Sequence, residues 1–170
     1  MLISLIIAVA VLAADQLSKY WVQTVLQPIV DIPLWDGVFH FHYARNTGAA
    51  FSMLEGQSWL FYIFTVLVVV IMAIYLIRNH KTMHPLLKVN LGLIIGGALG
   101  NFIDRVALGY VVDFLYVKII NFAIFNVADM ALVVGCILLG FYILFIHDKH
   151  TAKLNKTEEN DESDGGNDHA

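Results

Sequence analysis

Residues Trp59–Ile77 read WLFYIFTVLVVVIMAIYLI, a run without a single charge. A helix needs about 20 predominantly apolar residues to cross a bilayer, so this run is long enough to span one. The whole chain of 170 residues shows the same tendency, with 59% hydrophobic residues, 14% charged residues and a mean hydropathy of +0.72. Soluble domains carry about 25% charged residues. The composition therefore predicts an integral membrane protein.

Three other apolar runs accompany this one. Together they predict transmembrane helices at about 2–22, 59–77, 87–104 and 128–146. The first run has no Lys or Arg before its apolar part, unlike a secretory signal peptide, so we expect an uncleaved span. The predicted fold class is mainly α: a four-transmembrane-helix bundle in which residues 1–150 form a single membrane-embedded domain.

The distribution of Lys and Arg predicts the orientation, because cytoplasmic loops are enriched in both. The link between the second and third spans contains Arg78, Lys81 and Lys88, and three lysines follow the last span. Both segments are expected in the cytoplasm. This arrangement places both termini inside and residues 23–58 and 104–128 outside.

The end of the chain differs in composition from the rest. Six of the fourteen acidic residues lie in its last fourteen positions, whereas all ten Lys and Arg residues precede them. We expect residues 151–170 to form a disordered, acidic cytoplasmic tail. Nothing in the charge pattern indicates nucleic-acid binding.

The first outer segment shows a β pattern. Aromatic and histidine residues alternate over Phe39–Tyr43, as in a strand or hairpin. Pro33 and the pair Asp36-Gly37 are interpreted as turns. The sequence thus predicts a small β-containing extracytoplasmic segment, with His40 and His42 on one strand face at the surface.

Polar residues collect at one depth. At 1.5 Å per residue, Asp15, Asp104 and Asp129 lie about 21, 24 and 27 Å from the cytoplasmic ends of their helices. In a hydrocarbon core about 30 Å thick, all three fall in the outer third. Further polar residues belong to the same side: Asn46, Asn101, Arg105, Asp113 and Asn126. Because polar groups at membrane depth are costly, this gathering is a functional-site hypothesis.

Several of these residues also have structural interpretations. Asp15 and Lys19 are four residues apart and could form an ion pair on one helix face, or position an outer site. The sequence Asn126–Asp129 resembles a helix capping box. Each interpretation remains open from the sequence.

Other patterns favour structural roles. Gly92, Gly96 and Gly100 recur every four residues, the spacing that lets membrane helices approach closely. His80 and His84 have a spacing that suits a metal, but no carboxylate or cysteine lies nearby, so a solvated loop is favoured. No metal site is predicted.

Two of the acidic residues suit catalysis. Asp113 and Asp129 both lie among apolar neighbours, which favours a neutral acid. If folding brings them together, one keeps its proton while the other ionises, and the pair can activate a water. Asp104 differs because Arg105 follows it, so we interpret Asn101, Asp104 and Arg105 as an orienting group.

Five motifs, in this order, resemble the lipoprotein signal peptidase family, the bacterial signal peptidase II enzymes. The resemblance covers roughly residues 1–148 and is carried by DQLSK (Asp15–Lys19), NTGAAFS (Asn46–Ser52), GGALGNFIDR (Gly96–Arg105), GYVVDF (Gly109–Phe114) and FNVAD (Phe125–Asp129). Two departures from the family pattern, Met130 and Leu115-Tyr116, could alter substrate fit.

The resemblance implies an aspartic endopeptidase of the bacterial cytoplasmic membrane, without metal or cofactor. It would cleave diacylglyceryl-modified prolipoproteins just before the lipidated cysteine, at the extracytoplasmic face, as a monomer whose other partner is membrane lipid. Asp113 and Asp129 match the catalytic aspartates. The positions that match the family's supporting residues are Asp15, Lys19, Asn46, Gly48, Gly100, Asn101, Arg105, Asn126 and Ala128.

Placement alone suggests that the strand Phe39–Tyr43 and the segment NTGAAF clamp the substrate from above. Two other functions remain as alternatives, a small proton-coupled transporter or channel subunit and a non-catalytic membrane scaffold. A transporter would spread its ionisable groups across the whole bilayer.

Overall fold

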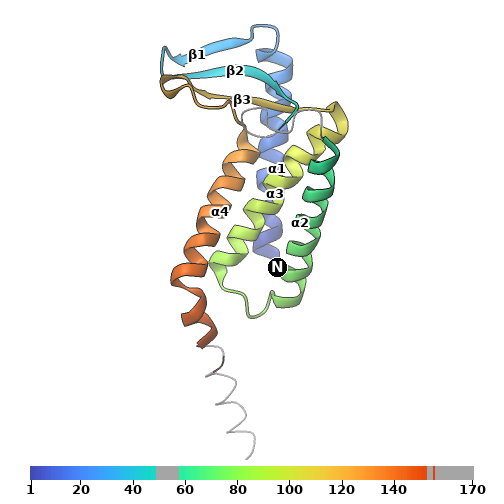
Figure 1. Cartoon of the computed structure of the whole chain (residues 1–170), viewed down its shortest axis with the longest axis vertical. Coiled ribbons are helices and arrows are strands. Elements are labelled where there is room, and N and C mark those ends of the chain that lie inside the picture. Colours follow the sequence, from blue (N-terminus) through green and yellow to red (C-terminus); the bar gives the residue numbers. More distant parts are fainter. Residues whose placement is uncertain (49–57, 153–154, 156–170) are drawn as a thin grey trace, which may run out of the picture.

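The computed structural model describes residues 1–48, 58–152 and 155. Four long helices stand side by side and a small sheet covers one end of them (Figure 1). The helices are α1 (Leu2–Trp21), α2 (Ser58–Asn79), α3 (Pro85–Leu108) and α4 (Val127–Phe145). All four are long and apolar enough to cross a membrane, with α1 continued by a π-helical turn to Leu26. The predicted four-helix membrane fold with a β-containing segment is confirmed.

The helix ends follow from local sequence. α3 begins at Pro85, whose missing N–H costs nothing in a first turn, and the His84 side chain accepts a hydrogen bond from the Leu86 N–H. His84 therefore caps a helix instead of lying in a solvated loop. The same helix ends at Gly109, which adopts a left-handed conformation with φ +80°.

Glycines set the distance between α1 and α3. A Cβ atom on Gly92 or Gly96 would lie 2.7 Å from the carbonyl oxygen of Ser4 or Ala8, respectively. No side chain fits at such a distance, so the two backbones touch. The close-packing role predicted for this four-residue repeat is confirmed. By contrast, α2 packs mainly against α3 and lies at the edge of the bundle.

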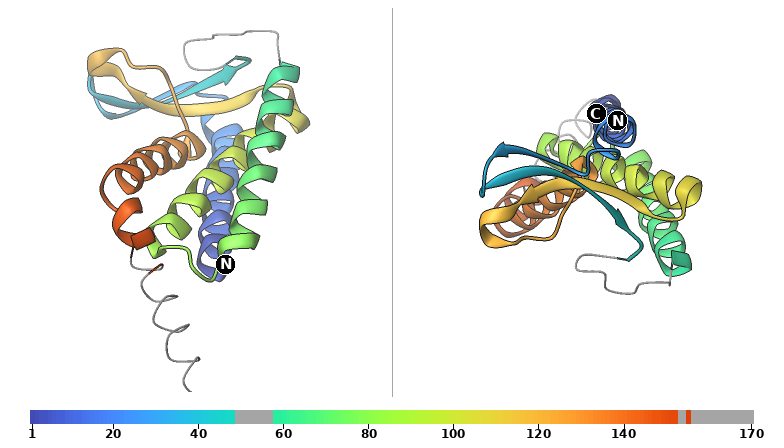
Figure 2. Two further views of the ribbon diagram at one scale, coloured as in Figure 1. Left: turned by 60° about the horizontal axis from the view of Figure 1, so that its bottom comes forward. Right: turned by 90° about the horizontal axis from the view of Figure 1, so that it is seen from above.

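The sheet has the order β1-β2-β3 and is antiparallel throughout. Its strands are β1 (Asp31–Trp35), β2 (Phe39–Asn46) and β3 (Val111–Val117). β1 and β2 form the predicted hairpin, whose turn contains Gly37 at φ +72°. Pro33, interpreted as a turn residue, lies instead inside the edge strand β1, a position that needs no donor toward a further strand. The sheet crosses above the helix ends (Figure 2).

β3 was not anticipated from the sequence. Its first four residues lack a clean polar and apolar alternation because they are buried on both faces. On one face, Val112 and Phe114 pack against Val22 and Leu26 at the end of α1. This cluster fixes the sheet on the bundle.

The prediction of surface histidines is wrong for His40, which is only 2% exposed. Its Nδ1 lies 2.9 Å from one carboxylate oxygen of Asp31, and Nδ1 of His42 lies 3.0 Å from the other. Asp31 thus holds both rings against the sheet. The segment 49–57, with half of the predicted NTGAAF clamp, and nearly all of the acidic tail lie outside the described residues.

Candidate active site

Asp113 lies in the middle of β3 and is 2% exposed. Pairing of β3 with β2 brings Asn46 beside it, and Asn46 Nδ2 donates to Asp113 Oδ2 at 2.9 Å. Asn126 Nδ2 donates to the other oxygen at 2.6 Å. Each oxygen of this carboxyl group therefore accepts from an asparagine amide.

Asp129 is the third residue of α4, where the predicted capping box is present. Asn126 accepts from the Asp129 N–H at 2.9 Å, and the Asp129 side chain accepts from the Asn126 N–H at 3.2 Å. The second carboxylate oxygen of Asp129 accepts from Asn101 Nδ2 at 2.7 Å. The predicted capping box is confirmed, but it uses only one of the two carboxylate oxygens of Asp129.

Asn126 connects the two acids, because its side chain donates to Asp113 while its backbone donates to Asp129. No cation forms an ion pair with either acid among the described residues. Burial first, and the charge of Asp129 second, raise the pKa of Asp113 from 3.8 to about 7, against the opposing effect of the asparagine donors. Near neutral pH, Asp113 can therefore hold a proton.

A second acidic pair lies next to this one and has a cation. The Lys19 ammonium is 2.8 Å from Asp15 and 3.1 Å from Asp104, and all three side chains are almost fully buried. Lys19 also donates to Asn101 Oδ1 at 3.0 Å. The ion pair Asp15–Lys19 thus exists and is also linked to Asp129 through Asn101.

The predicted association of Asp104 with Arg105 is not what the structure shows. Asp104 pairs with Lys19 and accepts from the Val112 N–H at 3.0 Å, which attaches β3 to α3. Arg105 donates to the carbonyl oxygens of Gly48 and Asn101. The two neighbours in sequence serve different parts of the site.

Two small residues complete the contacts. The Ala128 N–H donates to Asp15 Oδ1 at 2.9 Å, so α1 binds the first turn of α4. A Cβ on Gly100 would lie 2.5 Å from Asp15 Oδ2. The structure thus places every predicted site residue in one connected group: Asp15, Lys19, Asn46, Gly48, Gly100, Asn101, Arg105, Asn126, Ala128, Asp113 and Asp129.

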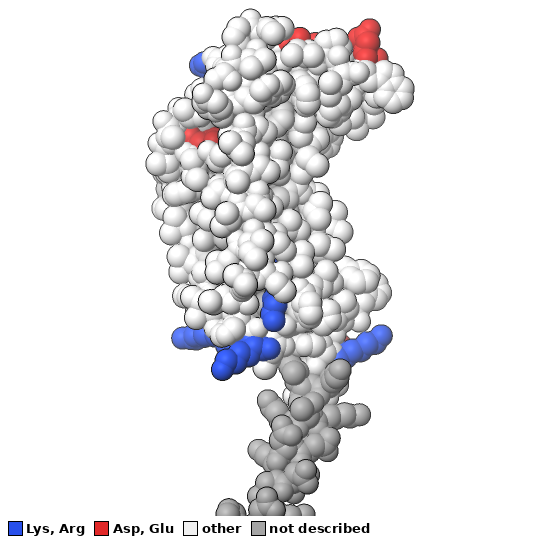
Figure 3. Space-filling model, turned by 180° about the vertical axis from the view of Figure 1, so that it is seen from behind, with Lys and Arg blue, Asp and Glu red and all other residues white. Residues whose placement is uncertain are grey.

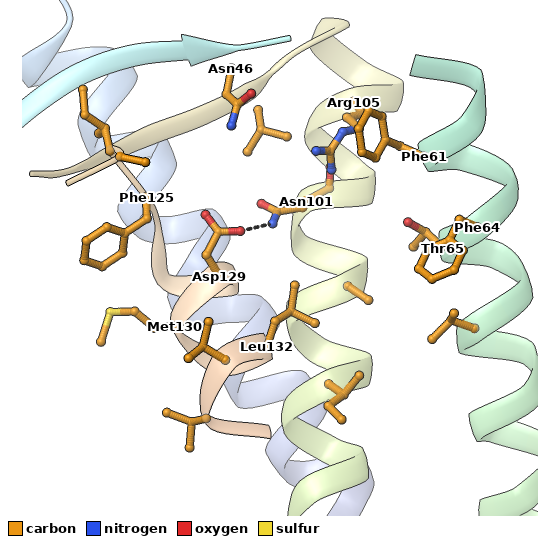
Figure 4. A pocket seen from close by; sticks show the side chains of 18 of the residues that line it. Asn46, Phe61, Phe64, Thr65, Asn101, Arg105, Phe125, Asp129, Met130 and Leu132 are labelled. Carbon is orange, nitrogen blue, oxygen red and sulfur yellow. Dashed lines mark hydrogen bonds between the residues drawn. The ribbon is translucent and has the colours of Figure 1, made fainter. Parts of the chain in front are cut away.

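A groove of about 680 Å³ opens beside this group, between α2, α3, α4 and the segment before α4. Its polar end is formed by Asn46, Asn101, Arg105 and Asp129, and the rest of its wall is almost entirely apolar (Figure 4). Asp129 lines the groove directly, whereas Asp113 is hydrogen-bonded to Asn46, which also lines it. A long apolar substrate could therefore bind with one end at the acids.

Sequence reasoning missed two contributors. Gln16 Nε2 donates to Asp104 Oδ1 at 3.0 Å and to the Gly100 carbonyl oxygen at 3.2 Å. Its place beside Asp15 in the DQLSK motif was the available signal. The second is Phe61, whose ring centre lies 4.5 Å from the Arg105 guanidinium carbon. No feature of the uncharged α2 sequence distinguished Phe61 from its neighbours.

The strand part of the predicted clamp is not supported. Phe41 packs with Trp21 and Phe114 between the sheet and the end of α1, and neither Phe39 nor Phe41 lines the groove. Within the described ranges, no three His, Cys, Asp or Glu side chains are arranged to hold a metal ion.

Comparison with known proteins agrees with this arrangement. Residues 7–145 match the family model described as signal peptidase (SPase) II. The chain is 49% identical over 141 residues to the lipoprotein signal peptidase of Geobacillus kaustophilus, covering 82% of this chain and 91% of that protein. It is 42% identical over 145 residues to that of Clostridioides difficile, covering 85% and 97%.

Solved structures give the same result at the level of the fold. A bacterial membrane enzyme structure obtained by the in meso method superposes with a TM-score of 0.76 at 34% identity, covering 86% of this chain and 88% of the other. A second such structure superposes with a TM-score of 0.74 at the same identity. The chain belongs to the signal peptidase II family.

Proposed function

We propose that this protein removes the signal peptide from diacylglyceryl-modified prolipoproteins, with Asp113 and Asp129 as its catalytic pair. The observation that carries the proposal is two carboxyl groups joined through Asn126 at the polar end of an apolar groove. One proton on such a pair gives an acid and a base without a metal or a covalent intermediate.

The raised pKa of Asp113 supports the assignment of roles. Asp129 faces the groove and takes a proton from a water as the water oxygen attacks the scissile carbonyl carbon. Asp113 gives its proton to the carbonyl oxygen, which produces a neutral gem-diol. Asp129 then protonates the departing nitrogen, a hydroxyl proton of the diol returns to Asp113, and the C–N bond breaks. The products are a signal peptide with a free carboxyl group and a lipidated cysteine with a free amine.

The orientation is part of the proposal. Basic side chains gather at the end of the bundle opposite the sheet (Figure 3), and these include Arg78, Lys81, Lys88 and Lys149. Because Lys and Arg favour the cytoplasmic side, we place this end and both termini in the cytoplasm of a bacterial inner membrane. The acids then lie at the extracytoplasmic face, where a translocated precursor presents its cysteine. We propose that the protein acts there as a monomer.

The distribution of polar groups argues against a proton relay. Among the described residues, no Asp, Glu, Lys, Arg or His is buried away from the sheet end, where the buried polar residues include Ser4 and Asn90. An amide flip lets Asn90 bond both the Gly135 oxygen and the Leu139 N–H, which is a helix-packing role. A transporter would need titratable groups along the whole path.

The proposal is tested with purified full-length protein in detergent and two versions of one precursor peptide. We expect cleavage directly before the cysteine when it carries diacylglyceryl. We expect little cleavage when the cysteine is unmodified, because the acyl chains supply most of the apolar surface that the groove can bury. Equal cleavage of both precursors, or cleavage at another bond, would contradict the proposal.

A further inference from the structure

One wall of the groove carries a single polar group below the acids. α2 contributes Phe61, Phe64, Thr65 and Val68 to the lining, and only Thr65 can form a hydrogen bond. In Figure 4 its hydroxyl points from α2 toward the groove. A hydroxyl group on an otherwise apolar wall at membrane depth is costly unless it forms a hydrogen bond with a bound molecule or with the protein.

Serine and threonine hydroxyl groups on the described helices mostly bond to their own backbone. Ser18 donates to the Asp15 carbonyl oxygen at 2.8 Å, Thr24 to that of Tyr20 at 3.0 Å and Thr151 to that of His147 at 3.1 Å. Across the described part of the chain, Thr65 forms no such bond. Ser4 is the other exception, but its hydroxyl is buried where α1 meets α3, away from the groove.

Thr65 lies close in depth to the polar end of the groove, where the two acids are. It follows Phe61 by four residues, and the Phe61 ring contacts the Arg105 guanidinium at the polar end. Four residues of helix rise about 6 Å. The hydroxyl therefore faces the groove about one turn below the polar end, on the side of the hydrocarbon.

We propose that the Thr65 hydroxyl donates a hydrogen bond to an ester carbonyl oxygen of the diacylglyceryl group. This inference rests on the proposed function, because it identifies the acyl esters of that substrate as the bound group. An ester joined to the cysteine sulfur through glycerol lies several bonds below the scissile peptide, which suits the depth of Thr65. The acyl chains then continue along Phe64 and Val68.

The chemistry favours an ester over a peptide carbonyl. The carbonyl groups of a transmembrane signal helix are satisfied within the helix. Ester carbonyls have no such partner, and they lose their interfacial water when the substrate enters the groove. An unpaired buried acceptor costs about 1–3 kcal/mol, so a donor at this depth favours a diacylated substrate.

The other donor side chains at the polar end already make hydrogen bonds within the protein. Asn101 Nδ2 donates to Asp129 and Asn46 Nδ2 donates to Asp113. Arg105 donates to two backbone carbonyl oxygens, and its guanidinium carbon lies 4.5 Å from the centre of the Phe61 ring. Among the described residues that line this groove, Thr65 is the donor side chain for which no hydrogen bond within the protein is found.

The test compares Thr65→Val, which keeps the shape but removes the hydroxyl, with wild type on two substrates. One precursor carries diacylglyceryl, and the other carries dialkylglyceryl, in which ether links replace the esters and remove their carbonyls. On the ester substrate, we expect Thr65→Val to raise KM about 3- to 10-fold with little change in kcat, as for one net hydrogen bond. On the ether substrate, we expect wild type and variant to have the same KM. Thr65→Ser should retain the wild-type preference.

The controls separate this inference from the proposed function. Thr24→Val removes a hydroxyl that bonds to its own helix outside the groove and should change neither KM. Wild-type cleavage of both substrates keeps the proposed function intact whatever Thr65 does. An unchanged KM on the ester substrate would overturn the inference. An equal KM rise on both substrates would also overturn it, because the hydroxyl would then bind a peptide carbonyl or serve the fold.

Discussion

Two pairs of aspartates lie side by side at the sheet end of this bundle, and they differ in one component. Asp15 and Asp104 share the buried ammonium of Lys19. Within the described ranges, Asp113 and Asp129 are bound only by neutral amide donors, of which Asn126 contacts both. A carboxylate beside a cation stays ionised, whereas a pair without one retains a proton. The comparison shows how similar residues become an anchor in one case and an acid–base pair in the other.

The largest effect is expected from removing the acid–base pair. Asp113→Asn and Asp129→Asn should each lower kcat by about 10²–10⁴-fold, the usual contribution of general acid–base catalysis, with substrate binding retained. The matched control is Asp36→Asn, since that carboxylate is 94% exposed. Near-normal turnover of either isosteric variant would refute the catalytic pair.

Removing the cation of the other pair should mainly affect folding. Lys19→Met leaves Asp15 and Asp104 buried without a counter-charge, and breaking a buried pair in this way costs about 3–5 kcal/mol. Lys118→Met is the control because Lys118 lies exposed after β3. Unfolding in detergent measures both. A Lys19→Met protein as stable as wild type would show that the two pairs do not differ as described.

A methyl group at Gly100 should disturb the contact between the anchor and α4. The added Cβ would lie 2.5 Å from Asp15 Oδ2 and 3.2 Å from the Ala128 Cβ. Asp15 cannot move freely because Lys19 and the Ala128 N–H hold it, so we expect Gly100→Ala to cost about 1–3 kcal/mol. Gly140→Ala is the matched control, since nothing lies within 4 Å of its Cβ position. Equal unfolding midpoints for the two variants would contradict this packing.

The pH dependence should reveal the proton on Asp113. Its pKa rises to about 7 on folding, so the native state binds this proton more tightly than the unfolded state. The resulting stabilisation is complete below the ordinary value of 3.8 and is lost as pH rises through about 7. Between pH 5 and pH 8 the unfolding midpoint of wild type should fall more steeply than that of Asp113→Asn. Parallel slopes would mean that Asp113 is already ionised at pH 5.

The pH dependence of kcat should also reflect the protonation of Asp113. If Asp113 must be protonated, kcat should decrease about tenfold per pH unit above about 7. The Asp36→Asn variant should show the same profile as wild type. A rate that stays constant to pH 9 would assign the acid role elsewhere.

Much of the fold could be predicted from the sequence because membrane helices are recognised by their length and apolar composition. Trp59–Ile77 has no other reasonable reading, and the helix bounds observed for α2 differ from it by only one or two residues. The capping box at Asn126 and the glycine repeat in α3 were also visible, since both depend on local spacing.

Other features depend on contacts that no local pattern encodes. The first four residues of β3 are buried on both faces and so lack alternation. His40 is buried where Asp31 on the neighbouring strand binds it. The partner of Asp104 could not be read from the adjacent Arg105, because side chains one residue apart on a helix point in different directions. Lys19 reaches it across the helix interface instead.

The central claim is that Asp113 carries a proton that it shares with Asp129 near neutral pH. Infrared difference spectra of wild type minus Asp113→Asn, recorded in a detergent without carbonyl groups, test it directly. We predict a protonated-carboxyl band at pH 6 that is absent from the variant and disappears with a midpoint of about pH 7. Absence of that band at pH 6, or its persistence in Asp113→Asn, would contradict the account.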